Sequence, residues 1–116
     1  MAKSNKISNY YQNQLDLFRQ LVETNPVIEI KGATIPYVSY NGYMFAYLEK
    51  DGSFGLRLPA DAIDGFLKKY KTTLFRSYGV IKKEFVLVPD ELLRNIKELK
   101  PFFELSFEQV KSLKPK

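Results

Sequence analysis

Residues 35–58 read IPYVSYNGYMFAYLEKDGSFGLRL and contain two hairpin signals between strand-like runs. Asn41-Gly42 lies between runs rich in Tyr, Val and Phe, and Asn-Gly favours a type I′ turn because both central residues of that turn need a positive φ. Asp51-Gly52 gives the same kind of signal one strand later. The stretch therefore predicts three antiparallel strands at the centre of a sheet.

The length of the loop at Asp51-Gly52 decides which side chains share a face of the sheet, because successive strand residues point to opposite faces. A two-residue loop places Phe54, Leu56 and Leu58 on the aromatic side of the preceding strand, and a three-residue loop places them on its aliphatic side. We favour the three-residue loop, in which a type I turn is followed by a glycine bulge. The aromatic side consists of Tyr43, Phe45 and Tyr47, and the aliphatic side, which we expect to face the helices, consists of Met44, Ala46 and Leu48.

Apolar spacing and turn residues predict the remaining elements. Before the central strands we expect a helix capped by Ser8 or Asn9 and stopped by Asn25-Pro26, and then a short edge strand over 27–31. After them we expect a helix beginning at Pro59-Ala60-Asp61 and two strands, over 72–75 and 81–88, around Tyr78-Gly79. The last element is a helical region from Asp90 that Pro101 splits in two.

This order of elements predicts one two-layer α+β domain with a mainly antiparallel sheet, written α-β(3)-α-β(2)-α, over residues 1–116. We expect residues 1–8 and 112–116 to be flexible, with Lys114 to Lys116 frayed. The polar start of the chain predicts no signal peptide, and no apolar run approaches the roughly 20 residues needed to span a bilayer. We therefore expect a cytoplasmic protein.

Composition excludes several kinds of chemistry. The chain has no Cys and no His, so it lacks thiolate nucleophiles, sulfur metal ligands and the commonest general base. We expect no catalytic residues, no metal and no cofactor. The formal charge is +5, but without the lysines at its two ends the 18 basic residues fall to 13, which equals the number of acidic residues. The body of the chain is therefore neutral.

The segments NGYMFAYL, DGSFGLRLP, FLKKYKTTL, EFVLVPDELL and SLKPK, in this order, resemble the TfoX N-terminal domain family, in particular its free-standing single-domain members. The resemblance covers residues from about Val27 to Lys116. Two departures are Ile81 to Phe85, where relatives have Val-Met-Lys-Glu-Tyr, and Tyr43, where a His is common. The resemblance implies an α-β-α-β-α fold like that of secretion chaperones and a regulatory role related to competence, and it supplies no catalytic residues.

Two sets of residues are candidate binding sites. The first is an outward-facing aromatic and cationic surface that would bind a protein partner or a second copy, although such rings also commonly pack against helices. The second is a run without acidic residues that could bind nucleic acid, although solvated lysines are the simpler explanation. The aromatic set is Tyr40, Tyr43, Phe45, Tyr47 and Arg57, and the basic set is Lys68, Lys69, Lys71, Arg76, Lys82 and Lys83.

Overall fold

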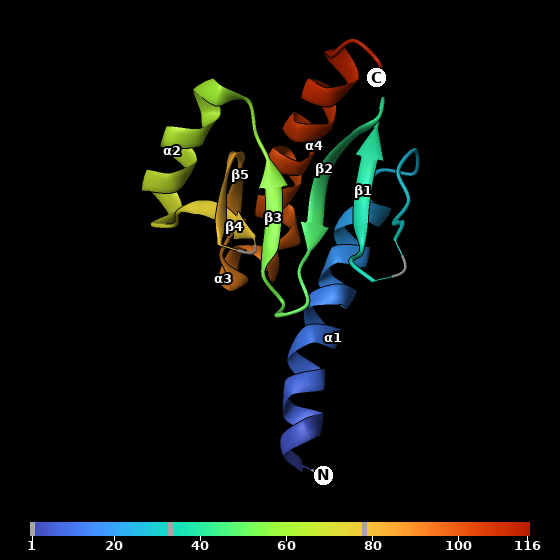
Figure 1. Cartoon of the computed structure of the whole chain (residues 1–116), viewed down its shortest axis with the longest axis vertical. Helices are drawn as coiled ribbons and strands as arrows, with labels where there is room; N and C mark the ends of the chain where they lie inside the picture. Colours follow the sequence, from blue (N-terminus) through green and yellow to red (C-terminus); the bar gives the residue numbers. More distant parts are fainter. Residues whose placement is uncertain (1, 33, 78) are drawn as a thin grey trace.

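A computed structural model describes residues 2–32, 34–77 and 79–116, with side chains from residue 9 onward. The described residues form four helices and five strands, in agreement with the predicted α+β class (Figure 1). The elements are α1 (Ala2–Glu23), β1 (Tyr37–Tyr40), β2 (Tyr43–Leu48), β3 (Phe54–Arg57), α2 (Ala60–Tyr70), β4 (Leu74–Ser77), β5 (Val80–Val88), α3 (Asp90–Leu93) and α4 (Ile96–Ser112).

The strands form one antiparallel sheet in the order β1-β2-β3-β5-β4. Helices α1 and α4 lie behind the sheet in the view of Figure 1, and the N-terminal half of α1 projects beyond it. Because of this projection the molecule is elongated, and it measures 48 Å along its longest axis and 30 and 29 Å along the other two axes. The two layers are therefore a sheet and a set of helices on one of its faces.

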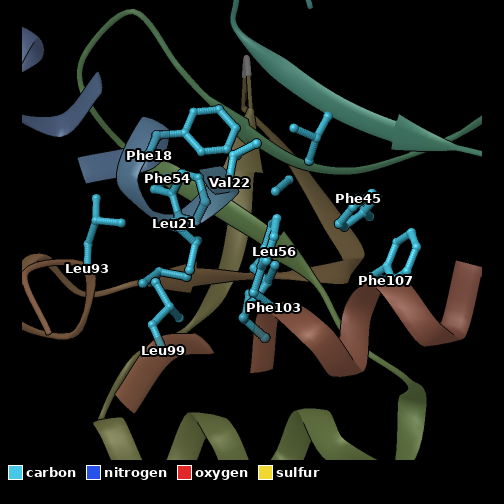
Figure 2. Packing of buried hydrophobic residues seen from close by; sticks show 14 of the residues in the cluster. Phe18, Leu21, Val22, Phe45, Phe54, Leu56, Leu93, Leu99, Phe103 and Phe107 are labelled. Carbon is cyan, nitrogen blue, oxygen red and sulfur yellow. The ribbon is translucent and has the colours of Figure 1, made fainter. Parts of the chain in front are cut away.

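The main core lies between the sheet and the helices. Phe18 and Leu21 of α1 and Phe103 of α4 are fully buried there against the central strands. Phe18 meets Phe54 edge-on, with ring centroids 4.9 Å apart. Figure 2 shows these side chains from α1, the strands and α4 converging on one cluster. Burial of this apolar surface is the main stabilising contribution to the fold.

Both predicted hairpins are present, and the loop of the second has three residues. Asn41 and Gly42 have φ of 57° and 84°, as a type I′ turn requires. In the second hairpin the amide of Glu49 donates to the carbonyl of Ser53, and Gly52 has φ of 91°. Leu48 consequently lies opposite Phe54, as the three-residue loop predicts.

A β-bulge corrects the prediction for the faces of β2. The pairing of β1 with β2 shifts by one residue between Val38 and Ser39, opposite Phe45. Phe45 therefore lies in the helix-facing core with Ala46, and Tyr47 lies in a second cluster on the opposite face. The prediction of one continuous aromatic side, and of a purely aliphatic helix-facing side, was wrong because the strict alternation of a strand is broken at a bulge.

The hairpin formed by β4 and β5 folds over the outer face of the sheet, which is the face away from the helices. Phe75 of β4 reaches past β5 to Gly55 of β3, where an added Cβ would lie 3.0 Å from the Phe75 ring. The same ring meets Tyr47 of β2 with centroids 5.0 Å apart. A side chain at position 55 would therefore prevent this close approach.

Three predicted boundaries were wrong. Helix α1 begins at Ala2 rather than at Ser8 or Asn9, and residues 27–31 contribute only one isolated bridge, between Lys31 and Tyr37. The C-terminal helical region breaks at Asn95, whereas Pro101 lies inside α4. Asn95 explains that break, because its side chain accepts from the amide of Glu98 at 3.3 Å and caps the new helix.

The C-terminal residues contact the first hairpin instead of fraying. The side-chain amide of Asn41 donates to the carbonyls of Val110, Lys111 and Leu113 at 3.1–3.3 Å. The backbone amide of Lys116 donates to the carbonyl of Asn41 at 3.1 Å. The Asn41-Gly42 turn thus also binds the end of α4. Flexibility was predicted for residues 1–8, whose side chains lie outside the described part of the structure. The predicted turn residue Tyr78 also lies outside the described residues.

Candidate binding site on the outer face of the sheet

The predicted aromatic surface is divided between the two faces of the sheet. Phe45 is fully buried between β2 and α4, where its ring centroid lies 5.6 Å from that of Phe103. Tyr40 packs edge-on against Phe107 on the same side at 5.0 Å. These two rings therefore stabilise the contact of α4 with the sheet and are not available to a partner.

Tyr43 and Arg57 take part in contacts near the C-terminal residues. The Tyr43 hydroxyl donates to the carbonyl of Lys114 at 2.9 Å. The guanidinium of Arg57 lies 5.6 Å from the centre of the Tyr43 ring, and the ammonium of Lys116 lies 4.7 Å from it. Arg57 also pairs with Glu84 at 3.3 Å. These interactions hold the C-terminal residues against the sheet, and cation–π contacts of this kind are favourable by about 0.5–1 kcal/mol each where they are exposed.

Tyr47 is the member of the predicted set that lies on the outer face in an aromatic cluster. It is buried against Phe75 and Phe85, with ring centroids 5.0 and 5.4 Å away. Burial raises the pKa of the Tyr47 phenol, and the carboxylate of Glu49 raises it further. Glu49 itself accepts a short hydrogen bond from the hydroxyl of Ser77. The outer face is thus apolar with a polar edge at Glu49 and Ser77.

A hollow of about 390 Å³ opens beside this cluster, and we call it the outer hollow. One side is formed by residues of β1 and β2, and the other by the β4–β5 hairpin. Met44 is 39 % exposed on β2, although the four residues that follow it are buried. The lining residues are Ile35, Tyr37, Met44, Tyr47, Glu49, Ser77, Lys82 and Phe85. Predominantly apolar hollows of this size with a few polar groups are typical of binding sites.

The predicted basic set lies on two elements. Lys68, Lys69 and Lys71 are exposed at the C-terminal end of α2, where Lys71 ends the helix in a left-handed conformation. Arg76, Lys82 and Lys83 are exposed on the β4–β5 hairpin. Lys82 is the member of this set that lines the outer hollow. The structure therefore brings one residue of the basic set together with Tyr47 of the aromatic set.

Several lining residues were not singled out as site residues from the sequence. Met44 was assigned to the helix-facing side, and the bulge opposite Phe45 moves it to the outer face. Ile35 is in neither predicted set. No pattern in the sequence around Met44 shows its exposure, because that depends on where the bulge lies.

A mainly apolar hollow of about 460 Å³ also lies between the end of α1 and residues 26–30. Two further hollows are less suited to a ligand. A hollow of about 410 Å³ separates residues 26–31 from β1, and a hollow of about 300 Å³ lies near Tyr70 and Glu98. Both have more polar than apolar lining. In residues 2–32, 34–77 and 79–116, no group of three or more acidic residues is arranged to hold a metal ion. No helix in these ranges is long and apolar enough to cross a membrane.

A scan against protein-family models and searches of curated proteins and of solved structures found no match to this chain. The resemblance to the TfoX N-terminal domain family therefore stays a prediction.

Proposed function

We propose that the protein is a non-enzymatic interaction module that binds a protein partner, or a second copy of itself, through the outer face of its sheet. The exposure of Met44 in the outer hollow is the observation that supports this role most directly. Met is a flexible apolar side chain that suits contact surfaces. Its neighbours Tyr37 and Ile35 are half-buried and extend the apolar surface.

The resemblance to TfoX N-terminal domains supports a regulatory role in the cytoplasm within the same proposal. A regulator of this kind acts by binding and needs no cofactor, metal or catalytic residue. The absence of Cys and His from the chain is consistent with that role.

Site-specific photocrosslinking tests the proposal. A photoreactive amino acid replaces Met44 in the outer hollow, and the matched control carries it at Asp64, which is exposed on α2. In source cells we expect a discrete crosslinked adduct from position 44 and none from position 64. Equal adducts at both positions, or none at either, would contradict binding through this face.

The second candidate function is nucleic-acid binding by the basic set. The observation that favours it is the exposure of all six cationic side chains, together with the lack of any ion pair between them and a described acidic residue. Gel-shift titrations at several salt concentrations test it, since phosphate contacts make affinity fall steeply with salt. Binding should also weaken when Lys82 and Lys83 are replaced by Glu. Absence of a shift at low salt would exclude this function.

A further inference from the structure

We infer that the outer hollow binds a peptide segment in which an apolar side chain is followed by acidic residues. This inference rests on the proposed function and adds the chemistry of the partner. The shape of the hollow accounts for the apolar part of the segment, and the charge at its edge accounts for the acidic part.

The hollow can accept one or two apolar side chains. Met44 and Tyr37 form one side, and Phe85 forms the other, so an apolar group inserted between them contacts carbon atoms on both sides. Beside the hollow, Phe75 packs against the lining residue Tyr47 and lies over Gly55 of β3. Contact residues on a partner that enter such a site usually contribute most of the binding free energy.

The edge of the hollow formed by the hairpin is cationic. Lys82 lines the hollow, and Lys83 is exposed on the same hairpin, whereas Arg76 lines a separate hollow with the acidic residues Glu49 and Asp51. None of the three forms an ion pair with a described residue, whereas the acidic residue beside them, Glu84, pairs with Arg57. Lys82 and Lys83 therefore leave an excess of positive charge on this hairpin, which is complementary to an acidic segment, while Glu49 is the acidic residue that lines the hollow.

Apolar groups beside these cations distinguish a peptide from a nucleic acid as the partner. Val80 is 57 % exposed on the same side of the hairpin as Lys82, and Ile81, which is 46 % exposed, lies on the other side. A phosphate backbone has no apolar group to cover Val80, whereas a peptide that continues past the hollow does. On the opposite side Glu49 accepts from Ser77 and faces the hollow, so it is available to a backbone amide of the bound segment.

Peptide selection followed by calorimetry tests the inference. Immobilised protein selects from a displayed library of random peptides, and we expect enrichment of Asp or Glu beside Leu, Ile or Phe. A synthetic peptide with the enriched sequence should bind Lys82→Glu about tenfold more weakly than the unchanged protein, because like charges then meet. Replacing the acidic residues of the peptide by Lys should restore binding to Lys82→Glu.

Lys69→Glu is the matched control, because it makes the same charge change at an exposed position on α2. We expect this variant to bind the peptide as the unchanged protein does. Met44→Gln serves as a second variant that alters the apolar surface without changing charge, and it should also weaken binding. Thermal melts of each variant report whether the fold is retained.

Three results would overturn the inference. They are an enriched set without acidic residues, equal effects of Lys82→Glu and Lys69→Glu, and displacement of the peptide by a short single-stranded oligonucleotide that binds more tightly. An adduct at position 44 together with any of these results would leave the proposed function standing and remove only the acidic-peptide partner. Failure of both crosslinking and selection would remove both.

Discussion

Replacement of Asn41 should destabilise the fold by separating the C-terminal residues from the first hairpin. Its side-chain amide donates to three carbonyls at the end of α4. An amide has two N–H groups, so at most two of these bonds are well formed at once. At about 0.5–1.5 kcal/mol for each bond, the two bonds contribute about 1–3 kcal/mol.

Asn41→Gly and Asn41→Asp separate the contribution of the amide from that of the turn. Glycine tolerates the φ of 57° at this position, so the first variant keeps the turn and loses the donor. Added freedom of the unfolded chain costs roughly 0.5 kcal/mol more, which gives a total loss of about 1.5–3.5 kcal/mol. In Asn41→Asp a carboxylate faces the same carbonyls and the negative end of the α4 dipole, which adds about 0.3–1 kcal/mol.

Urea unfolding followed by circular dichroism measures these losses, and a loss of 2 kcal/mol should lower Tm by roughly 8 °C for a chain of this size. At pH 3 the carboxyl of Asn41→Asp is protonated and can donate again, so part of its loss should be recovered relative to the unchanged protein. Asn13→Asp is the control, because position 13 is exposed on α1. The reasoning is refuted if Asn41→Asp recovers no stability between pH 7 and pH 3 relative to the unchanged protein, or if both variants match the control.

Three further predictions concern other contacts. Gly55→Ala should lower the free energy of unfolding by about 1–3 kcal/mol through overpacking against Phe75, and the loss should largely disappear in a Phe75→Ala background, as measured by urea unfolding. Pro101→Ala should raise the free energy of unfolding by about 2 kcal/mol, because proline inside a helix lacks a hydrogen-bond donor, and an unchanged or lower Tm would contradict this. Burial and then the hydrogen bond to Glu98 raise the pKa of Tyr70 from 10.0 to about 12, so the stability contributed by the protonated phenol is present below pH 10 and is lost as the pH rises toward 12. Ultraviolet titration should show Tyr70 ionising at lower pH in Glu98→Gln, and an unchanged titration would refute the assignment.

The hairpins could be predicted because their signals are local. Asn-Gly and the sequence around Gly52 specify backbone conformations that few other residue pairs adopt, and both appear as expected. The order of elements followed from the spacing of apolar residues. These local preferences were sufficient for the fold class and for the register of β2 with β3.

The bulge opposite Phe45 could not be predicted in this way. Tyr, Phe and Met fit either face of a half-buried strand, so the sequence of β2 does not show where alternation breaks. The packing of Phe45 against Phe103 and Phe107 makes the helix-facing position favourable. Because these partners are distant in sequence, the outer hollow and its residue Met44 became visible only in the folded chain.

The break at Asn95 has a signal in the sequence that competes with the proline signal at Pro101. Asn95 and Glu98 have the spacing of a capping box, and Asn95 also donates to the Glu98 carboxylate at 3.2 Å. Pro101 is exposed, so its ring avoids the core although its position in α4 remains unfavourable. Competing helix signals should therefore be compared by the hydrogen bonds that each can make.

The cover that Phe75 provides over Gly55 has a consequence for the local unfolding of the sheet. β3 has buried residues on both faces and a hydrogen-bonded strand on each side. β1 has an outer edge that pairs with residues 27–31 through a single bridge. Amide hydrogen exchange should therefore be slowest in β3, where exchange requires opening of the whole domain, and faster in β1. The most stable part of the sheet thus lies beneath Phe75, beside the outer hollow.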